Sequence, residues 1–422
     1  MPVFALILGP NVNTEFVRKP DLVEMAKSKV FFSDRKAESY YNMLDKLEHV
    51  LNQLGIPETI QQGEKVMIKT HFGQWGNTNY IRPAYVRKVV ELVRSADAEP
   101  FVAESCGLGY GSEGRYGGRS TAPEYVAMAA LNGFSEGTLG APVIIADGYW
   151  GTDTFNVEVD GTFVKNVDVA AAVLDCDKVI VLSHAKGHLH GGIAGSLKNL
   201  GIGLVGKRGK AAMHTTGPLR VDPAKCRGPE CSQCLDVCPV RCITMNEKAE
   251  IDSGECIACV HCSSVCDEIE ARAITVAWRP EHEQAPIFVE NAMGVVKSIG
   301  ADRFYYVNLA IDISDKCDCW NVGATLLVHD IGIFGSRNPV AVDQACFDAV
   351  NKADPNPESV VANVAQGTDK FAVAHSIKDP RTGETAHLAE IQLGHAEEMG
   401  LGNRDYELVR LRKEPPPKSR VH

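Results

Sequence analysis

The chain has 422 residues, is 45% hydrophobic and carries a formal net charge of −11. This acidic balance argues against nucleic acid or an anionic membrane surface as a partner. No apolar run reaches the roughly 18 residues that a membrane span needs. The first eight residues are apolar but lack the basic flank of a signal peptide. Fourteen cysteines without an export signal predict a reducing, cytoplasmic location.

Short apolar runs alternate with helical patterns over most of the chain. Helices are predicted from Pro83, with valines on one face, and from Val340 to about Val350, capped by Asn338 and Pro339. Residues 20–55 are expected to form a helical segment that leads into the first strand. Strands are predicted at residues 65–69, 100–103, 142–146, 178–182 and 324–328. This alternation predicts an α/β fold with a mostly parallel sheet flanked by helices. Its two parts are residues 1–218 and 279–413, and residues 414–422, with three consecutive prolines, are expected to form a loose tail.

Eight cysteines between Cys226 and Cys266 have the spacing of a ferredoxin that holds two cubane clusters. The first group reads C-x4-C-x2-C-x3-C-P and the second C-x2-C-x2-C-x3-C. In such runs three thiolates bind one [4Fe–4S] cluster and the fourth binds the other cluster. The predicted ligand sets are Cys226, Cys231, Cys234 and Cys266 for one cluster, and Cys256, Cys259, Cys262 and Cys238 for the other. We therefore expect an inserted α+β domain of the bacterial two-cluster ferredoxin type at residues 219–278. Oxygen-sensitive clusters would suit an anaerobe.

Two departures from the bacterial pattern point to one altered or labile cluster. The first gap is two residues longer, and Asp267 stands where a proline often follows the last cysteine. An internal repeat supports two clusters, because residues 241–245 (RCITM) echo residues 272–276 (RAITV). Cys242 takes the place of Ala273 in this repeat and is expected to be a packing residue. A pair of zinc knuckles is the alternative, although zinc sites rarely use eight cysteines in this order. Disulfides are expected less still.

A second candidate site follows the strand predicted at residues 178–182. The stretch 183–199 is rich in glycine, histidine and lysine. Ligands of open α/β sheets bind beyond the carboxyl ends of the strands, and glycine-rich loops let backbone N–H groups approach an anion or cofactor. We therefore predict a functional cleft, against the alternative of an ordinary turn with solvated side chains. Its candidate residues are His71, His184, His188, His214, Lys186 and Lys198.

Cys317 and Cys319 form a C-x-C pair, a spacing that can chelate a metal ion. The alternative is two small buried residues beside a turn. Asp330 and Asp343 are candidates for the same cleft, although lone carboxylates of this kind are usually caps or members of ion pairs. Residues 109–114 match G-x-G-x-x-G after a strand, but the following residues do not continue as a helix. A dinucleotide site is therefore not expected there.

Several short motifs together resemble the ferredoxin-containing branch of domain-of-unknown-function family 362. The motifs lie at residues 68–73 (IKTHFG), 146–148 (ADG), 183–188 (SHAKGH), 198–201 (KNLG), 209–214 (GKAAMH), 317–319 (CDC), 330–332 (DIG) and 338–343 (NPVAVD). The resemblance covers nearly the whole chain. It implies an iron–sulfur protein but no activity, because the family name assigns none.

A fainter resemblance is to the nickel-pincer lactate racemases, which carry a histidine, a glycine-rich loop, a lysine and a second histidine. Residues at matching intervals here are His188, Gly192, Gly195, Lys198 and His214. The resemblance implies that Lys198 anchors the cofactor, that His214 binds nickel and that His188 moves protons. The residues after Lys198 depart from the proline–glycine usual in that family. A shared scaffold with a different ligand is therefore an equal alternative.

The sequence thus predicts an iron–sulfur electron-transfer protein or oxidoreductase that passes electrons between two [4Fe–4S] clusters and a cleft in the α/β domain. One alternative is an isomerase-like enzyme with a metal or pincer cofactor at Lys198 and His214, and another is a non-enzymatic ferredoxin-like adaptor. The partner is expected to be a redox protein or a small-molecule substrate. The candidates are His188, His184, His71 and Lys198 for catalysis, Lys198, Gly192, Gly195 and His214 for an organic cofactor, and Cys317, Cys319 and His214 for a further nickel or iron ion.

Overall fold

The structure, a computed structural model, describes residues 27–108 and 118–412. The predicted loose tail at residues 414–422 and the G-x-G-x-x-G match at residues 109–114 lie outside the described residues. Within the described ranges, none of the helices combines the length and the apolar character that crossing a membrane requires.

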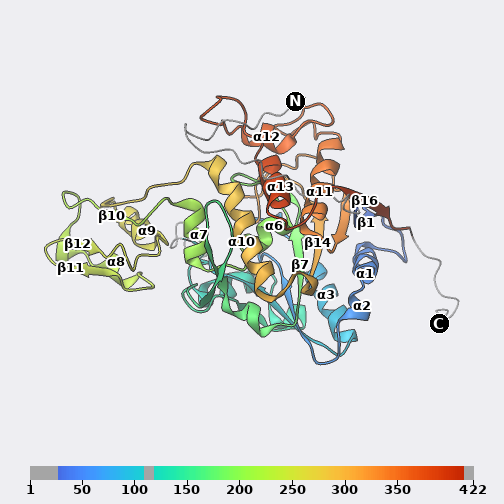
Figure 1. Cartoon of the computed structure of the whole chain (residues 1–422), viewed down its shortest axis with the longest axis horizontal. Helices are drawn as coiled ribbons and strands as arrows, with labels where there is room; N and C mark the ends of the chain where they lie inside the picture. Colours follow the sequence, from blue (N-terminus) through green and yellow to red (C-terminus); the bar gives the residue numbers. More distant parts are fainter. Residues whose placement is uncertain (1–26, 109–117, 413–422) are drawn as a thin grey trace, which may run out of the picture.

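An eight-stranded sheet forms the centre of the described part of the chain (Figure 1). All its neighbouring strands are parallel except at β15, which is antiparallel to both of its neighbours. The predicted α/β fold with a mostly parallel sheet is therefore confirmed. The strand order is β16 (Tyr406–Arg410), β1 (Ser28–Asp34), β15 (Gly332–Ser336), β14 (Phe304–Ala310), β7 (Lys178–His184), β2 (Lys65–Lys69), β3 (Glu99–Glu104) and β4 (Val143–Ile145).

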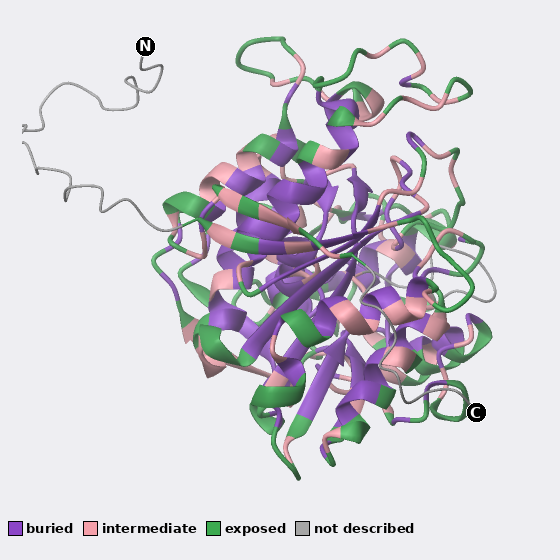
Figure 2. Ribbon diagram, turned by 90° about the vertical axis from the view of Figure 1, so that its right-hand side faces the viewer, coloured by how far each residue is buried: buried purple, intermediate pink, exposed green. Residues whose placement is uncertain are grey.

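Helices cover both faces of this sheet, which is why its central strands are continuous apolar runs (Figure 2). α3 begins at Pro83, as predicted, and buries Val86, Val89 and Val90 in the core of one face. The helices on that face are α1 (Met43–Gln53), α3 (Pro83–Ser95) and α4 (Ala122–Leu131). The opposite face is covered by α6 (Ser196–Gly201), α10 (Gln284–Ile299), α11 (Pro339–Lys352) and α13 (Leu388–Glu398).

Two predicted elements are wrong. The described part of residues 20–55 begins with strand β1, and the helix α1 starts only at Met43, where Asn42 caps it. Residues 324–328 form no strand, because their backbone makes isolated bridges with loops, from Leu326 to Ser314 and from Val328 to Pro355. Leu327 and Val328 of that segment are still buried, so hydrophobicity alone suggested a strand.

The glycine-rich stretch at residues 183–199 contains a hairpin. Strand β7 ends at His184, β8 (Lys186–His188) pairs with β9 (Gly192–Ala194), and α6 then begins at Ser196. Gly192 has a φ of +73°, and a Cβ at this position would collide with the backbone of Ala389 in α13. Only glycine fits this turn. Shorter elements are α2 (Ile56–Thr59), α5 (Glu136–Leu139), α12 (Lys370–His375), and the hairpin of β5 (Thr154–Glu158) and β6 (Asn166–Ala170).

The cysteine-rich segment forms a small unit that extends to one side of the sheet (Figure 1). Its two halves repeat, since Arg241 and Arg272 both have positive φ, 53° and 48°, and both precede a short strand. A hydrophobic cluster of its own fills the unit. Its elements are β10 (Arg220–Val221), α8 (Gln233–Asp236), β11 (Ile243–Met245), β12 (Ala249–Ile251), α9 (His261–Glu268) and β13 (Ile274–Thr275).

Two connecting segments, hydrogen-bonded to each other, join this unit to the α/β part. The entering and leaving chains form a bridge between Thr215 and Trp278, and the N–H of Thr216 donates to the carbonyl of Ala277 at 2.9 Å. The entering chain comes from α7 (Lys207–His214), and the N–H of Arg279 on the leaving chain donates to the carbonyl of His214. The position of the unit is therefore set by α7.

Candidate functional site

A cavity of about 290 Å³ lies at the carboxyl ends of the central strands. The chain crosses from β2 to β3 on one side and returns to β7 on the other, so the strand order reverses between β2 and β7. Such a reversal leaves a crevice that open α/β sheets use for ligands. The cavity contains all the predicted catalytic residues, which are His71, His184, His188 and Lys198, together with His214, Cys317 and Cys319.

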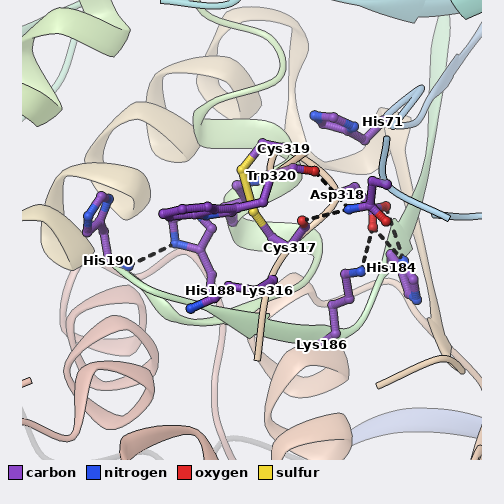
Figure 3. The surroundings of a disulfide bond; sticks show 12 residues. His71, His184, Lys186, His188, His190, Lys316, Cys317, Asp318, Cys319 and Trp320 are labelled. Atoms are coloured by element: carbon purple, nitrogen blue, oxygen red, sulfur yellow. Dashed lines mark hydrogen bonds and ion pairs between the residues drawn. A yellow bond between two sulfur atoms is a disulfide. The ribbon is translucent and has the colours of Figure 1, made fainter. Parts of the chain in front are cut away.

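A buried charge network forms the floor of the cavity around Asp318 (Figure 3). The carboxylate of Asp318 lies 2.9 Å from Nδ1 of His184 and 2.9 Å from Nζ of Lys186. Burial raises the pKa of Asp318, but the charges of His184 and Lys186 outweigh burial and hold this pKa well below its ordinary value. Nε2 of His184 faces the carbonyl of Ile311 at 2.6 Å. Both ring nitrogens of His184 are therefore occupied, which favours a positioning role for it.

His71 follows β2 and also lines the cavity. Its Nδ1 accepts from the N–H of Gly73 at 2.9 Å, and its Nε2 lies 3.2 Å from the guanidinium of Arg119. Burial and the charge of Arg119 lower the pKa of His71 well below its ordinary value. His71 is consequently neutral at pH 7. Because its Nδ1 accepts from Gly73, the ring proton lies on Nε2, so the approach of Arg119 is a close contact without charge repulsion and not a hydrogen bond.

Lys198 reaches into the same cavity from α6. Its Nζ donates to Sγ of Cys319 over 3.9 Å. Burial lowers the pKa of Lys198 to about 8, while the charge of Asp318 opposes that shift. Part of the Lys198 population is therefore uncharged near neutral pH, a property that suits an amine used in covalent or proton-transfer chemistry.

Three further histidines of the cavity are neutral at pH 7. The side chain of His188 accepts a backbone hydrogen bond from His190 at 3.2 Å, and its ring packs against Phe288. Burial lowers the pKa of His188 well below its ordinary value and that of His214 to about 3; burial also lowers the pKa of His190. A neutral imidazole keeps a lone pair on one ring nitrogen, which a hydrogen-bond donor or a metal ion can use.

Cys317 and Cys319 lie on the loop after β14 and are joined by a disulfide bond (Figure 3). One ligand atom of His188 and the two sulfur atoms all lie within 4.8 Å of one another. These three residues could hold one metal ion if the sulfurs were reduced. His214, which the sequence suggested as a ligand with the two cysteines, shares their cavity but does not belong to this group.

The remaining predicted residues have other surroundings. Gly195 lines the cavity and packs against Asp343, whereas Gly192 serves the hairpin turn. Asp343 accepts from the N–H groups of Ser196 and Leu197 at 2.7 and 2.9 Å and so caps α6. Asp330 accepts from Arg35 and from the N–H of Asp312. Neither carboxylate is among the described residues that line the cavity.

Several cavity residues escaped prediction from the sequence. Glu104 lines the cavity at the end of β3 and pairs at 3.0 Å with Lys69, which is fully buried at the end of β2. The signal for this pair was a charged residue at the end of each predicted apolar strand. Arg119 gave no such signal because it precedes α4 in a stretch without periodicity. His190 and Cys106 also line the cavity.

The eight cysteines of the small unit divide into two groups in space. One hollow is lined by Cys226, Cys231, Cys234 and Cys266. A second hollow is lined by Cys238, Cys256, Cys259 and Cys262. Cys242 also borders the second hollow, with its sulfur 3.6 Å from that of Cys238. The two groups have the same members as the sets that the crosswise rule predicts.

A match to a protein-family model shows which family the chain belongs to. The model for domain of unknown function DUF362 matches residues 66–348. The chain belongs to the DUF362 family. No curated protein matches it. A solved structure, the lactate racemase apoprotein from Thermoanaerobacterium thermosaccharolyticum, matches with 10% identity and a TM-score of 0.34 over 73% of this chain. This DUF362 protein spans 54% of the length of that structure.

Proposed function

We propose that this DUF362 protein is an iron–sulfur oxidoreductase that passes electrons between two [4Fe–4S] clusters in residues 219–278 and a substrate in the cavity. One observation carries the proposal: the eight cysteines separate into two sets of four, each around its own hollow. Bound clusters would supply one-electron chemistry at potentials that hydrogen bonds and burial adjust. We also propose that this small unit is a ferredoxin domain of the bacterial two-cluster type.

The surroundings of the sulfurs fit cubane clusters. The N–H groups of Ala249, Ala258 and Ala273 donate to cysteine sulfurs at 3.4, 3.4 and 3.1 Å. Such bonds stabilise thiolates bound to iron. The side chains around the two hollows are otherwise mostly apolar, with Val221 and Ile274 at the first and Leu219 and Ile243 at the second.

A chain of contacts leads from the second hollow to the cavity. His261, beside Cys262, lies with Nε2 2.8 Å from Nζ of Lys207 in α7. Lys207 and Cys106 pack together around Gly151, where an added Cβ would touch both side chains at 2.9 Å. Cys106 lines the cavity. The second cluster is therefore the one we expect to exchange electrons with the substrate.

The charges in the cavity favour a small anionic substrate. Among the described residues, ion pairs neutralise Glu104 through Lys69 and Asp318 through His184 and Lys186. In these described residues, Arg119 and Lys198 form no ion pair with a carboxylate of the cavity. Two cations in a cavity of about 290 Å³ would bind a carboxylate or a similar anion by charge-assisted hydrogen bonds.

A metal census on anaerobically prepared protein tests the proposal. We expect about eight irons per chain and an EPR signal from reduced cubanes after dithionite treatment. Cys231→Ala and Cys259→Ala should each abolish one cluster, whereas Cys242→Ala, at the fifth sulfur of the second hollow, should retain both clusters. Iron without electron uptake, or zinc in place of iron, would contradict the proposal.

A second candidate is a cofactor-dependent isomerase, favoured by one observation: His188, Lys198 and His214 line the same cavity. Lys198 would anchor a pincer cofactor covalently and His214 would hold the metal. Intact mass of the peptide containing Lys198 and a search for metals other than iron separate this candidate from the first. An unmodified lysine and iron alone would exclude it. A non-enzymatic adaptor would keep its electron transfer after replacement of His188 and His214.

A further inference from the structure

The disulfide between Cys317 and Cys319 lies in the wall of the cavity, where a ligand can reach it. Cys317 is buried and Cys319 is half-buried, and both line the cavity. Only one residue separates them in the sequence. A disulfide stabilises a fold mainly by closing long loops in the unfolded chain, so this bond contributes little to stability. A contribution to stability therefore does not explain why the disulfide lies in the cavity wall, and a chemical role would explain it.

The loop that carries the two sulfurs is held from three directions. Nδ2 of Asn77 donates to the carbonyls of Cys317 and Trp320 at 3.3 and 3.0 Å. The guanidinium of Arg119 donates to the carbonyl of Cys319 at 3.1 Å. Asp318, between the two cysteines, is anchored by His184 and Lys186. The backbone is therefore fixed whether or not the sulfurs are bonded, so that the bond can open and close without refolding.

The groups beside the sulfurs distinguish the two cysteines. Nζ of Lys198 lies 3.9 Å from Sγ of Cys319, and a nitrogen of His188 lies within 4.8 Å of both sulfurs. A nearby ammonium group stabilises a thiolate. When the disulfide is reduced, Cys319, the more exposed of the two residues, would therefore become the thiolate and Cys317 the thiol.

We infer that Cys317 and Cys319 form a redox-active pair that cycles between a disulfide and a dithiol inside the cavity. Reduction breaks the S–S bond and consumes two electrons and one proton, giving a thiolate at Cys319 and a thiol at Cys317. The proton is taken up from solvent. The electrons come from a low-potential one-electron donor that delivers them singly through residues 219–278, so this inference rests on the proposed function. It names the group in the cavity that collects two electrons.

The reducing location expected from the sequence agrees with a redox-active pair. Disulfides that persist in proteins of such compartments are mostly catalytic or redox-sensing, and cysteines that bind iron must stay reduced. The other free cysteines of the α/β part in the described ranges are Cys106, Cys176 and Cys346, all buried and unbonded. The Cys317–Cys319 pair thus differs from all three in bonding, and of the three only Cys106 shares its cavity. A metal ion bound by His188 and the two sulfurs is the competing arrangement, and the experiment below separates the two.

Anaerobic reductive titration of the full iron-loaded protein tests the inference. The wild type should take up about four electrons, two at the clusters and two at the disulfide, whereas the Cys317→Ser/Cys319→Ser variant should take up about two. Cys176→Ser, a replacement at a buried thiol whose Sγ donates to the carbonyl of Val173, should behave as wild type. Alkylation and peptide mapping should label Cys317 and Cys319 only after reduction.

Each other outcome overturns the inference. An uptake of two electrons in both proteins, or labelling of the pair before reduction, shows that the pair does not cycle. Protection of the pair by a metal other than iron shows that it is a metal site. Failure of the proposed function looks different, because the clusters themselves would then show no EPR signal and no electron uptake in any variant.

Discussion

Replacing Asp318 by asparagine tests the charge network under the cavity. The substitution keeps the shape of the side chain but removes its charge, and leaves the Lys186 ammonium and the His184 ring facing a neutral amide. The side chains of Asp318 and His184 are each 4% exposed and that of Lys186 is 1% exposed. Water therefore cannot replace the missing carboxylate.

The expected cost follows from the burial of the two interactions that the substitution weakens. Each is a close charge-assisted contact at 2.9 Å in a site that excludes solvent. Removing one partner of a buried ion pair costs about 3–5 kcal/mol, because the remaining charge is uncompensated. The unfolding free energy of Asp318→Asn should fall by about that amount. Since the pKa of Asp318 is lowered in the folded protein, the difference should persist at all pH values above about 4 and shrink as the pH falls below that.

Urea unfolding, followed by far-UV circular dichroism at pH 7 and at pH 3.5, measures this difference. Asp160→Asn is the matched control, since Asp160 pairs with Lys165 at the surface and does not line the cavity. It should leave the unfolding midpoint unchanged. If Asp318→Asn unfolds at the wild-type urea concentration at pH 7, the carboxylate is not the anchor of the C-x-C loop and the reasoning is refuted.

Three further predictions concern the scaffold of the cavity. Lys69→Met should cost about 3–5 kcal/mol by stranding Glu104, and Lys69→Met/Glu104→Gln should recover much of that stability in urea unfolding. Burial raises the pKa of Asp343 to about 6, so its ionisation opposes folding. Stability should fall by about 2 kcal/mol as the pH rises from 4 to 6, and a wild-type profile that matches Asp343→Asn over this range would contradict it. Gly201→Ala should prevent close packing of α6 on α10, because its Cβ would collide with the carbonyl of Phe288; soluble protein with wild-type stability would show that the helices can separate.

The fold could be predicted where the sequence pattern is local. Parallel strands buried on both faces are continuous apolar runs, and β2, β3, β4 and β7 were found on that basis. Strand β15 was missed because its two glycines, Gly332 and Gly335, hide its strand character. A Cβ at Gly335 would meet Val50 of α1. That glycine is there for close packing of a helix on the sheet, a tertiary reason that no local pattern reveals.

The candidate site could be predicted only in part for the same reason. His184, His188 and Lys198 follow one strand, so a single stretch of sequence brought them together. Arg119 lies in the same cavity but far away in the sequence from its neighbours there. It contacts His71 and Cys319, which are 48 and 200 positions away. Contacts at such separations depend on the crossing of whole elements. The role of Asp318 likewise depends on its two cationic partners, which the C-x-C spacing alone does not show.

Helix α7 explains how two sites that look independent in the sequence become one. Its Met213 and His214 line the cavity, whereas its Ala211 belongs to the hydrophobic cluster of the cysteine-rich unit. Its first residue, Lys207, contacts His261 beside the second set of cysteines. One short helix thus has a face in each site, and the chain enters the small unit directly from its end. A flexible tether would let the cysteines move relative to the cavity. A helix packed on both sides keeps them at a fixed separation, which the proposed electron transfer between the two sites requires.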